Sequence, residues 1–173
     1  MKIRTIKVGS LKTNCHLLLS KGEILVIDPG AESERIIQEI NNLNGFLKNI
    51  VTTHDHYDHV GAVNELESHF NIEKKTLTKN LNVGEMKLNV IKTPGHTKNS
   101  ICIIGNDFAF TGDTIFKNDH GRVDLPGGSM ESMKKSLDRL SEILRIGMII
   151  YPGHGQSFEL KTTDLKNKYI KDA

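Results

Sequence analysis

Histidine and aspartate crowd one short segment of the chain. His54, His56, Asp58 and His59 fall within six residues, directly after a short apolar run. In an extended segment residues two apart face the same way, so His54 and His56 can bind one metal ion while Asp58 and His59 diverge toward a second. Without a cation, so many imidazole and carboxylate groups would repel and desolvate one another. The segment therefore predicts a metal site.

Three further candidate ligands follow in similar settings. His96 stands in Thr-Pro-Gly-His-Thr, Asp113 in Thr-Gly-Asp-Thr and His154 in Pro-Gly-His-Gly. A glycine beside each lets the backbone turn sharply and bring the side chain in close. Because imidazole dominates this set, zinc or iron is favoured over calcium or magnesium. The other histidines lie outside these motifs and are expected to be surface or hydrogen-bonded residues: His16, His69 and His120.

The elements that must position these residues alternate between strand-like and helix-like segments, which is typical of the α/β class. An apolar run over 23–27 predicts a strand that stops at the turn 28–30. Ser33 is the expected cap of a helix that Gly45 ends. A strand opening at Ile50 leads into the ligand segment, and a helix follows it. Its apolar positions are Val60, Val63, Leu66 and Phe70.

The second half of the chain predicts hairpins and one long helix. Turns at 82–84 and 105–107 separate β-prone runs. A helix is expected near 129–146, ended by Gly147, with a strand over 148–151 after it. The lysine-rich end is expected to be a short helix or a frayed tail. Every ligand motif falls where a strand ends and a loop begins, which is where α/β folds usually place their sites.

Composition limits the classes of function. A chain of 173 residues predicts one domain, 1–173. A net charge of +2 does not favour a nucleic-acid or membrane partner. No run approaches the length of about 20 apolar residues that a membrane helix needs, and charges stand where a signal peptide would have its apolar core. Cys15 and Cys102 lack paired spacing, which together with the missing signal peptide predicts a cytoplasmic protein. The expected partner is a small-molecule substrate. The sequence does not indicate the oligomeric state.

The ordered combination of these motifs resembles the metallo-β-lactamase superfamily. Thr-His-Asp-His-Tyr-Asp-His at 53–59 matches its His-x-His-x-Asp-His signature. The resemblance implies an αβ/βα sandwich, in which two mixed β-sheets pack face to face with helices on the outer faces. It also implies two metal ions bridged by Asp113. The first ion would be bound by His54, His56 and His96, and the second by Asp58, His59 and His154.

Within that superfamily the chain resembles the glyoxalase II-like hydrolases, through the stretches 112–116 and 121–128. Asp113 stands where the commonest zinc β-lactamases carry a cysteine, so antibiotic hydrolysis is not expected. His56 stands where the flavodiiron branch typically has a glutamate. The implied activity is cleavage of a thioester or related activated ester by a metal-bridging hydroxide, which Asp58 helps to orient. Two zinc ions are the expected cofactors, with iron or manganese as alternatives.

The thiol carrier stays open. Typical glyoxalase II enzymes contact glutathione through a C-terminal helical domain, which is not expected here because the chain ends too soon. Arg122 takes a position where that group usually has a substrate-binding lysine, and His120 replaces a common cysteine. Arg122 could bind a substrate carboxylate bidentately, or it could pair with Asp124 and stabilise its own turn.

Three other functions remain as alternatives. A persulfide dioxygenase of the same fold uses one iron, which His54, His96 and Asp113 could hold. A nuclease is less favoured because no basic groove is evident. A non-enzymatic metal-binding module would be expected to have lost some of the ligands, and all seven are present.

Overall fold

The computed structural model describes residues 1–75 and 80–161. The chain forms two compact units, Met1–Asn89 and Val90–Ala173. The expectation of one domain over 1–173 stays a prediction. Among the described residues, no helix is long and apolar enough to cross a membrane.

The first unit is built on a four-stranded mixed sheet in the order β1-β2-β3-β4. Its strands are β1 (Lys2–Val8), β2 (Thr13–Ser20), β3 (Glu23–Ile27) and β4 (Phe46–Val51). The first three are joined by antiparallel pairing, whereas β4 runs parallel to β3. A parallel neighbour needs a crossover connection, and helix α1 (Ser33–Asn42) provides it.

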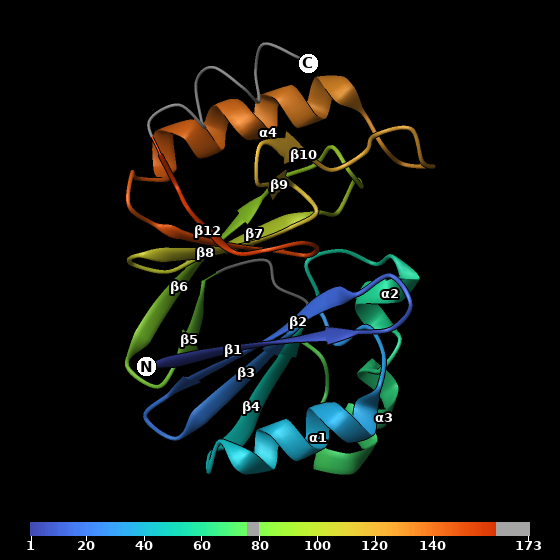
Figure 1. Cartoon of the computed structure of the whole chain (residues 1–173), viewed down its shortest axis with the longest axis vertical. Coiled ribbons are helices and arrows are strands. Elements are labelled where there is room, and N and C mark those ends of the chain that lie inside the picture. Colours follow the sequence, from blue (N-terminus) through green and yellow to red (C-terminus); the bar gives the residue numbers. More distant parts are fainter. Residues whose placement is uncertain (76–79, 162–173) are drawn as a thin grey trace. The chain divides into compact units, whose positions relative to one another are not determined.

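Helices cover one face of this sheet (Figure 1). Ile36 and Ile40 of α1 are buried with Leu66 of α3 (Val63–Phe70) in one apolar cluster, together with Leu17 and Val26 from the strands. Apolar residues three and four positions apart form the single stripe that α1 needs to pack in this way. The short helix α2 (Tyr57–Val60) precedes α3, and the hairpin of β5 (Leu81–Val83) and β6 (Met86–Lys92) follows it.

The second unit is also built on a mixed sheet. Its central strands are ordered β12-β11-β8-β7, with β11 parallel to β8 and the other pairs antiparallel. Helix α4 packs Met133, Leu137 and Leu140 against sheet residues such as Ile150 (Figure 1). The elements of this unit are β7 (Ile101–Ile104), β8 (Phe108–Gly112), β9 (Ile115–Phe116), β10 (Asp119–His120), α4 (Met130–Ile143), β11 (Ile149–Pro152) and β12 (Phe158–Glu159). The prediction of two mixed sheets with helices is confirmed.

Each unit contains one buried free cysteine. Cys15 lies in β2 and Cys102 in β7. Burial raises the pKa of both thiols, and raises that of Cys102 to about 11. Both residues therefore behave as small apolar residues, as their sequence context indicates.

Two predicted boundaries of the first helix are wrong. Its N-cap is Glu32, which has a left-handed backbone (φ 57°), and Ser33 is already helical. The carboxylate of Glu32 accepts hydrogen bonds from Gly9 N and Arg35 Nη1, so these contacts fix the helix start in place of a serine cap. The helix ends at Asn42, before Gly45, and Asn44 takes the left-handed conformation (φ 52°) that often follows a helix.

Other boundaries also shift. The helix expected after the ligand segment is divided into α2 and α3 at Gly61 and Ala62. Ser129 caps α4 by accepting a hydrogen bond from Ser132 N, but the helix ends at Ile143 rather than at Gly147. Strands β1 and β2 were not predicted as elements. The lysine-rich end lies outside the described residues.

Candidate metal centre

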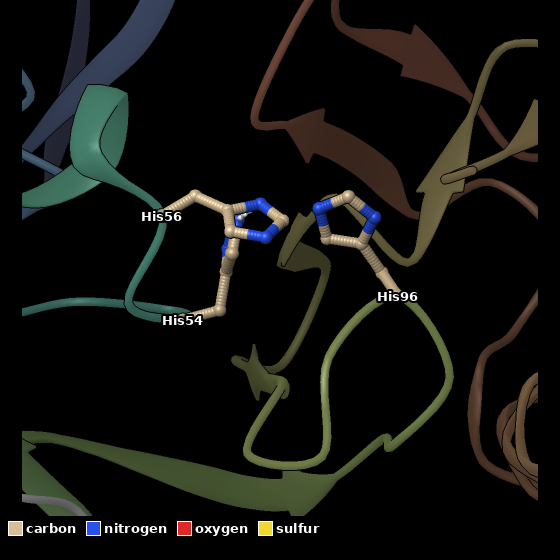
Figure 2. A group of neighbouring side chains, drawn as sticks. All are labelled: His54, His56 and His96. Atoms are coloured by element: carbon tan, nitrogen blue, oxygen red, sulfur yellow. Dashed lines mark hydrogen bonds between the residues drawn. The ribbon is translucent and has the colours of Figure 1, made fainter. Parts of the chain in front are cut away.

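The first unit brings four predicted ligands together at the end of β4; His54, His56, Asp58 and His59 are called the first-unit cluster. Ligand atoms lie within 4.8 Å of one another in the pairs His54–His56, His54–His59 and Asp58–His59. His54 and His59 are buried. Figure 2 shows the rings of His54 and His56 on the segment that follows β4. The structure therefore brings these side chains close together, and their role as metal ligands stays a prediction.

The buried carboxylate of Asp28 contacts residues of this cluster and the residue that precedes it. Asp28, only 1% exposed, follows β3 in a left-handed conformation (φ 55°). Its Oδ1 accepts a hydrogen bond from Thr53 N at 2.6 Å, and its Oδ2 accepts one from Thr53 Oγ1 at 2.7 Å. The same Oδ2 lies 3.0 Å from His59 Nδ1. Asp28 therefore holds both the strand end and one ligand histidine.

Thr53 extends this support to His54. A hydroxyl has one proton, and Thr53 donates it to Asp28. Its oxygen can then only accept from His54 Nδ1, which lies 3.1 Å away. Nδ1 carries the proton in this arrangement, so the lone pair of His54 is on Nε2, 3.1 Å from His56 Nδ1. Fixing the tautomer of a histidine through its other nitrogen is how proteins prepare it to bind a metal.

Asp58 is held in a similar way from β2. Thr13, which is fully buried, donates a hydrogen bond from Oγ1 to Asp58 Oδ2 at 2.7 Å. That oxygen also lies 3.5 Å from His59 Nε2. Gly30 allows the close approach of this region, because a Cβ there would lie 1.6 Å from the carbonyl oxygen of Asp58. Any side chain at position 30 would push α2 away from the turn after β3.

The second unit gathers the other three predicted ligands; His96, Asp113 and His154 are called the second-unit cluster. They follow β6, β8 and β11 respectively. Asp113 Oδ2 lies 3.5 Å from His96 Nε2 and 3.6 Å from His154 Nε2. His96 comes from the loop that follows β6 (Figure 2), and its Nδ1 donates a hydrogen bond to the carbonyl oxygen of Arg122 at 2.7 Å. Two histidines that are far apart in sequence thus lie close to one carboxylate oxygen of Asp113.

Arg122 binds Asp124. Its Nε and Nη2 donate to the two carboxylate oxygens of Asp124 at 2.8 and 2.7 Å. The pair raises the pKa of Arg122 and lowers that of Asp124 to about 2, mainly through these hydrogen bonds. The turn-stabilising pair predicted as one alternative is therefore present, and substrate binding by Arg122 stays a prediction.

The remaining histidines are hydrogen-bonded or exposed. His16 is buried, with its Nδ1 2.9 Å from Thr5 Oγ1, and His120 Nδ1 lies 2.9 Å from the carbonyl oxygen of Gly121. His69 is exposed on α3, with its ring against Phe70. None of the three belongs to either cluster.

Sequence reasoning missed the supporting residues Asp28, Thr53 and Thr13. Asp28 was interpreted only as part of a turn. One signal is available, because a carboxylate directly after the apolar run 24–27 is placed where burial without a partner would be costly. The role of Thr13 had no local signal, since it lies 45 residues from Asp58.

Comparison with known proteins decides the family. Residues 8–84 and 76–154 match the metallo-beta-lactamase superfamily. The chain belongs to this superfamily. It is 34% identical to hydroxyacylglutathione hydrolase GloC of Haemophilus influenzae, over 98% of each chain. The chain is therefore a metallo-hydrolase whose histidines and aspartates form clusters of the metal-binding type.

Solved structures confirm the metallo-β-lactamase fold. The BLEG-1 B3 metallo-beta-lactamase has a TM-score of 0.88 at 24% identity, covering 98% of this chain and 100% of the other. TTHA1623 in a di-iron-bound form has a TM-score of 0.85 at 23% identity, covering 96% of this chain and 98% of the other. At these identities the likeness shows the fold alone.

Proposed function

We propose that this superfamily member hydrolyses a thioester or a related activated ester at a centre that holds two metal ions. The observation that carries the proposal is the place of one atom, Asp113 Oδ2, within 3.5 and 3.6 Å of His96 Nε2 and His154 Nε2. A bridging ligand must present an oxygen between ligands of two different ions. In this proposal the first ion is held by His54, His56 and His96, and the second by Asp58, His59 and His154.

The donor atoms fit zinc or iron. Two nitrogen ligands of a tetrahedral zinc, each at about 2.0–2.1 Å, stand about 3.3 Å apart. His54 Nε2 and His56 Nδ1 are 3.1 Å apart. Both clusters offer nitrogen and carboxylate oxygen without thiolate, which suits zinc, iron or manganese. When bound, two such ions supply an activated water and polarise a substrate carbonyl.

Hydrogen bonds within the protein orient these candidate ligands in the absence of substrate. Asp28 and Thr53 hold His54 with its Nε2 lone pair available, and Thr13 orients the carboxylate of Asp58. Ligands held in this way need no rearrangement during the reaction, which is a main source of electrostatic catalysis. Neither cysteine supplies a nucleophile, because Cys15 and Cys102 are buried and their thiol pKa values are raised.

A thioester is the favoured substrate class because of the relative from H. influenzae, whose name describes a hydroxyacylglutathione hydrolase. The segment 117–128 is the candidate recognition segment. It follows β9 directly and contains Arg122, whose carbonyl oxygen accepts the hydrogen bond from His96. Arg122 would contact an acidic thiol carrier only by sharing or exchanging its hydrogen bonds with Asp124.

The test uses the protein with its natural metal content. Elemental analysis should find close to two transition-metal ions per chain, and thiol release should follow addition of an acylated glutathione or a neutral thioester. Oxygen uptake with a persulfide, and hydrolysis of a β-lactam, should both be absent. A fully loaded protein with one ion, or one that consumes oxygen without releasing thiol from thioesters, would contradict the proposal.

The role of Arg122 has its own measurement. If Arg122 binds a carboxylate of the thiol carrier, Arg122→Ala should raise KM about tenfold or more for an acidic thioester and leave a neutral one nearly unchanged. Equal losses on both substrates, reproduced by Asp124→Ala, would assign Arg122 to its own loop instead.

A further inference from the structure

We propose that the segment 121–124 is the positioning element of the second-unit cluster, and that Gly121 is its decisive residue. This inference rests on the proposed metal centre. Its first support is the hydrogen bond that His96 Nδ1 makes to the carbonyl oxygen of Arg122 at 2.7 Å. His96 is only 3% exposed, so the surrounding residues leave its ring little room to rotate away from this hydrogen bond.

The hydrogen bond decides which nitrogen of His96 is available. A carbonyl oxygen only accepts, so Nδ1 must carry a proton. The ligand lone pair is then on Nε2, the atom that lies 3.5 Å from Asp113 Oδ2. The segment therefore selects the tautomer of His96 that a metal ion needs, through its backbone and without any side chain.

Gly121 makes this backbone contact possible. A Cβ at this position would lie 1.9 Å from the carbonyl oxygen of Asp113 and 3.2 Å from His96 Nδ1. The first distance is far below any real contact, and the atom it meets is backbone, which cannot rotate away. A methyl group at position 121 must therefore displace the segment from Asp113, from His96 or from both.

The chain that follows this segment is also hydrogen-bonded to the loop that carries His96. Ser129 N donates to the carbonyl oxygen of Gly95 at 2.8 Å, directly before His96. Ser136 Oγ of α4 donates to the carbonyl oxygen of Pro94 at 2.6 Å. The backbone of Ser129 and the side chain of Ser136 thus hold the two residues that precede His96. By contrast, the ion pair of Arg122 with Asp124 is exposed, so it contributes less to this positioning.

The test compares Gly121→Ala with Gly105→Ala. Position 105 lies in the same unit, and a Cβ there would meet the ring of Phe108 at 2.4 Å, away from all ligands. Long-range proton–nitrogen spectra of the metal-free protein report the tautomer of His96, whose signals are assigned by their loss in His96→Gln. The wild type and Gly105→Ala should show the proton on Nδ1. Gly121→Ala should lose this preference and bind zinc about 10- to 100-fold more weakly in chelator competition.

Three results would overturn the inference: a wild-type His96 without its proton on Nδ1, a Gly121→Ala variant with unchanged tautomer and zinc affinity, or an equal loss of affinity in Gly105→Ala. If Gly121→Ala does not fold, the wild-type spectrum still tests whether the carbonyl oxygen of Arg122 selects the tautomer of His96. The proposed function fails separately, because a protein with the expected tautomer and zinc affinity that hydrolyses no thioester would contradict only that proposal.

Discussion

The two ligand clusters are held in different ways. In the first-unit cluster, side chains support the ligands, because Asp28 contacts Thr53 and His59 and Thr13 donates to Asp58. In the second-unit cluster, the backbone does this work, through the carbonyl oxygen of Arg122. The four ligands of the first-unit cluster lie within six residues, so they all depend on the position of one strand end. Neighbouring side chains hold that strand end and its ligands by hydrogen bonds.

This difference decides which substitutions each cluster tolerates. A hydrogen bond from a supporting side chain is lost when its residue is replaced by one that lacks the donor or acceptor group. A backbone brace survives most substitutions and fails only where a side chain cannot fit, as at Gly121. Substitutions that break side-chain braces should therefore have larger effects than those that change side chains on the loop 121–124.

The largest effect is expected for Asp28→Ala. The change leaves Thr53 N and Thr53 Oγ1 without their buried acceptor and removes the carboxylate oxygen that lies 3.0 Å from His59 Nδ1. A hydrogen bond to a charged group contributes about 1.5–3 kcal/mol, so the free energy of unfolding should fall by about 3 kcal/mol or more. Urea denaturation of the metal-free protein measures this. Asp28→Asn keeps one acceptor oxygen, so its free energy of unfolding should fall by less. Equal stability of Asp28→Ala and the wild type would show that the Asp28 hydrogen bonds do not stabilise the fold.

Asp113→Ala should mainly affect the metals. The change removes the oxygen that lies between His96 and His154, so elemental analysis should find fewer than two ions per chain and hydrolysis should fall about a hundredfold or more. Unfolding in urea should change much less than for Asp28→Ala, because Asp113 is partly exposed. The matched control is Asp119→Ala, an exposed carboxylate of the same unit, which should keep both ions. Full metal content and turnover in Asp113→Ala would disprove the bridge.

A smaller effect is expected for Thr13→Val. The variant keeps the shape of the side chain but removes the hydrogen bond to Asp58 Oδ2. Residues that orient a metal ligand typically change affinity by about 10- to 100-fold, so zinc titration should show one of two sites weakened by about tenfold. Thr13→Ser retains the hydroxyl and should bind like the wild type. If Thr13→Ser and Thr13→Val weaken zinc equally, packing rather than the hydrogen bond is responsible.

The smallest effect concerns the ion pair of Arg122 and Asp124. Since the pKa of Asp124 falls from 3.8 to about 2, the pair stabilises the folded protein above pH 3.8 and loses this contribution as the pH falls toward 2. Both side chains are largely exposed, so the difference in Tm between the metal-free wild type and Asp124→Asn should be a few degrees at most at pH 5. It should shrink at pH 3; a difference that grows would contradict the assigned sign.

The sequence predicted the parts of the site that are local. The density of histidine and aspartate over 54–59 and the glycines beside His96, Asp113 and His154 suggest all seven candidate ligands, and their metal-binding roles stay predictions. The Ser129 cap was also predictable, because a serine before a helical apolar pattern is a local signal.

The parts that sequence reasoning missed depend on contacts between distant residues. Thr13 and Asp58 are 45 residues apart, and His96 and Arg122 are 26 residues apart. The start of α1 depends on the contact of Glu32 with Gly9, 23 residues away, which outweighed the intrinsic preference of Ser33 for a capping position. No pattern within one segment of a single sequence contains this information.

The two buried cysteines divide evenly between the units, and this provides an internal probe of cooperativity. A thiol reacts as the thiolate, so burial with a raised pKa protects Cys15 and Cys102 from alkylation while their units stay folded. Cys15 becomes reactive when the first unit opens, and Cys102 when the second does. Alkylation at increasing urea concentration, followed by mass spectrometry of the two peptides, therefore reports two opening transitions in the unmodified sequence. Coincident transitions would mean that the units unfold together, and separate ones would rank their stabilities.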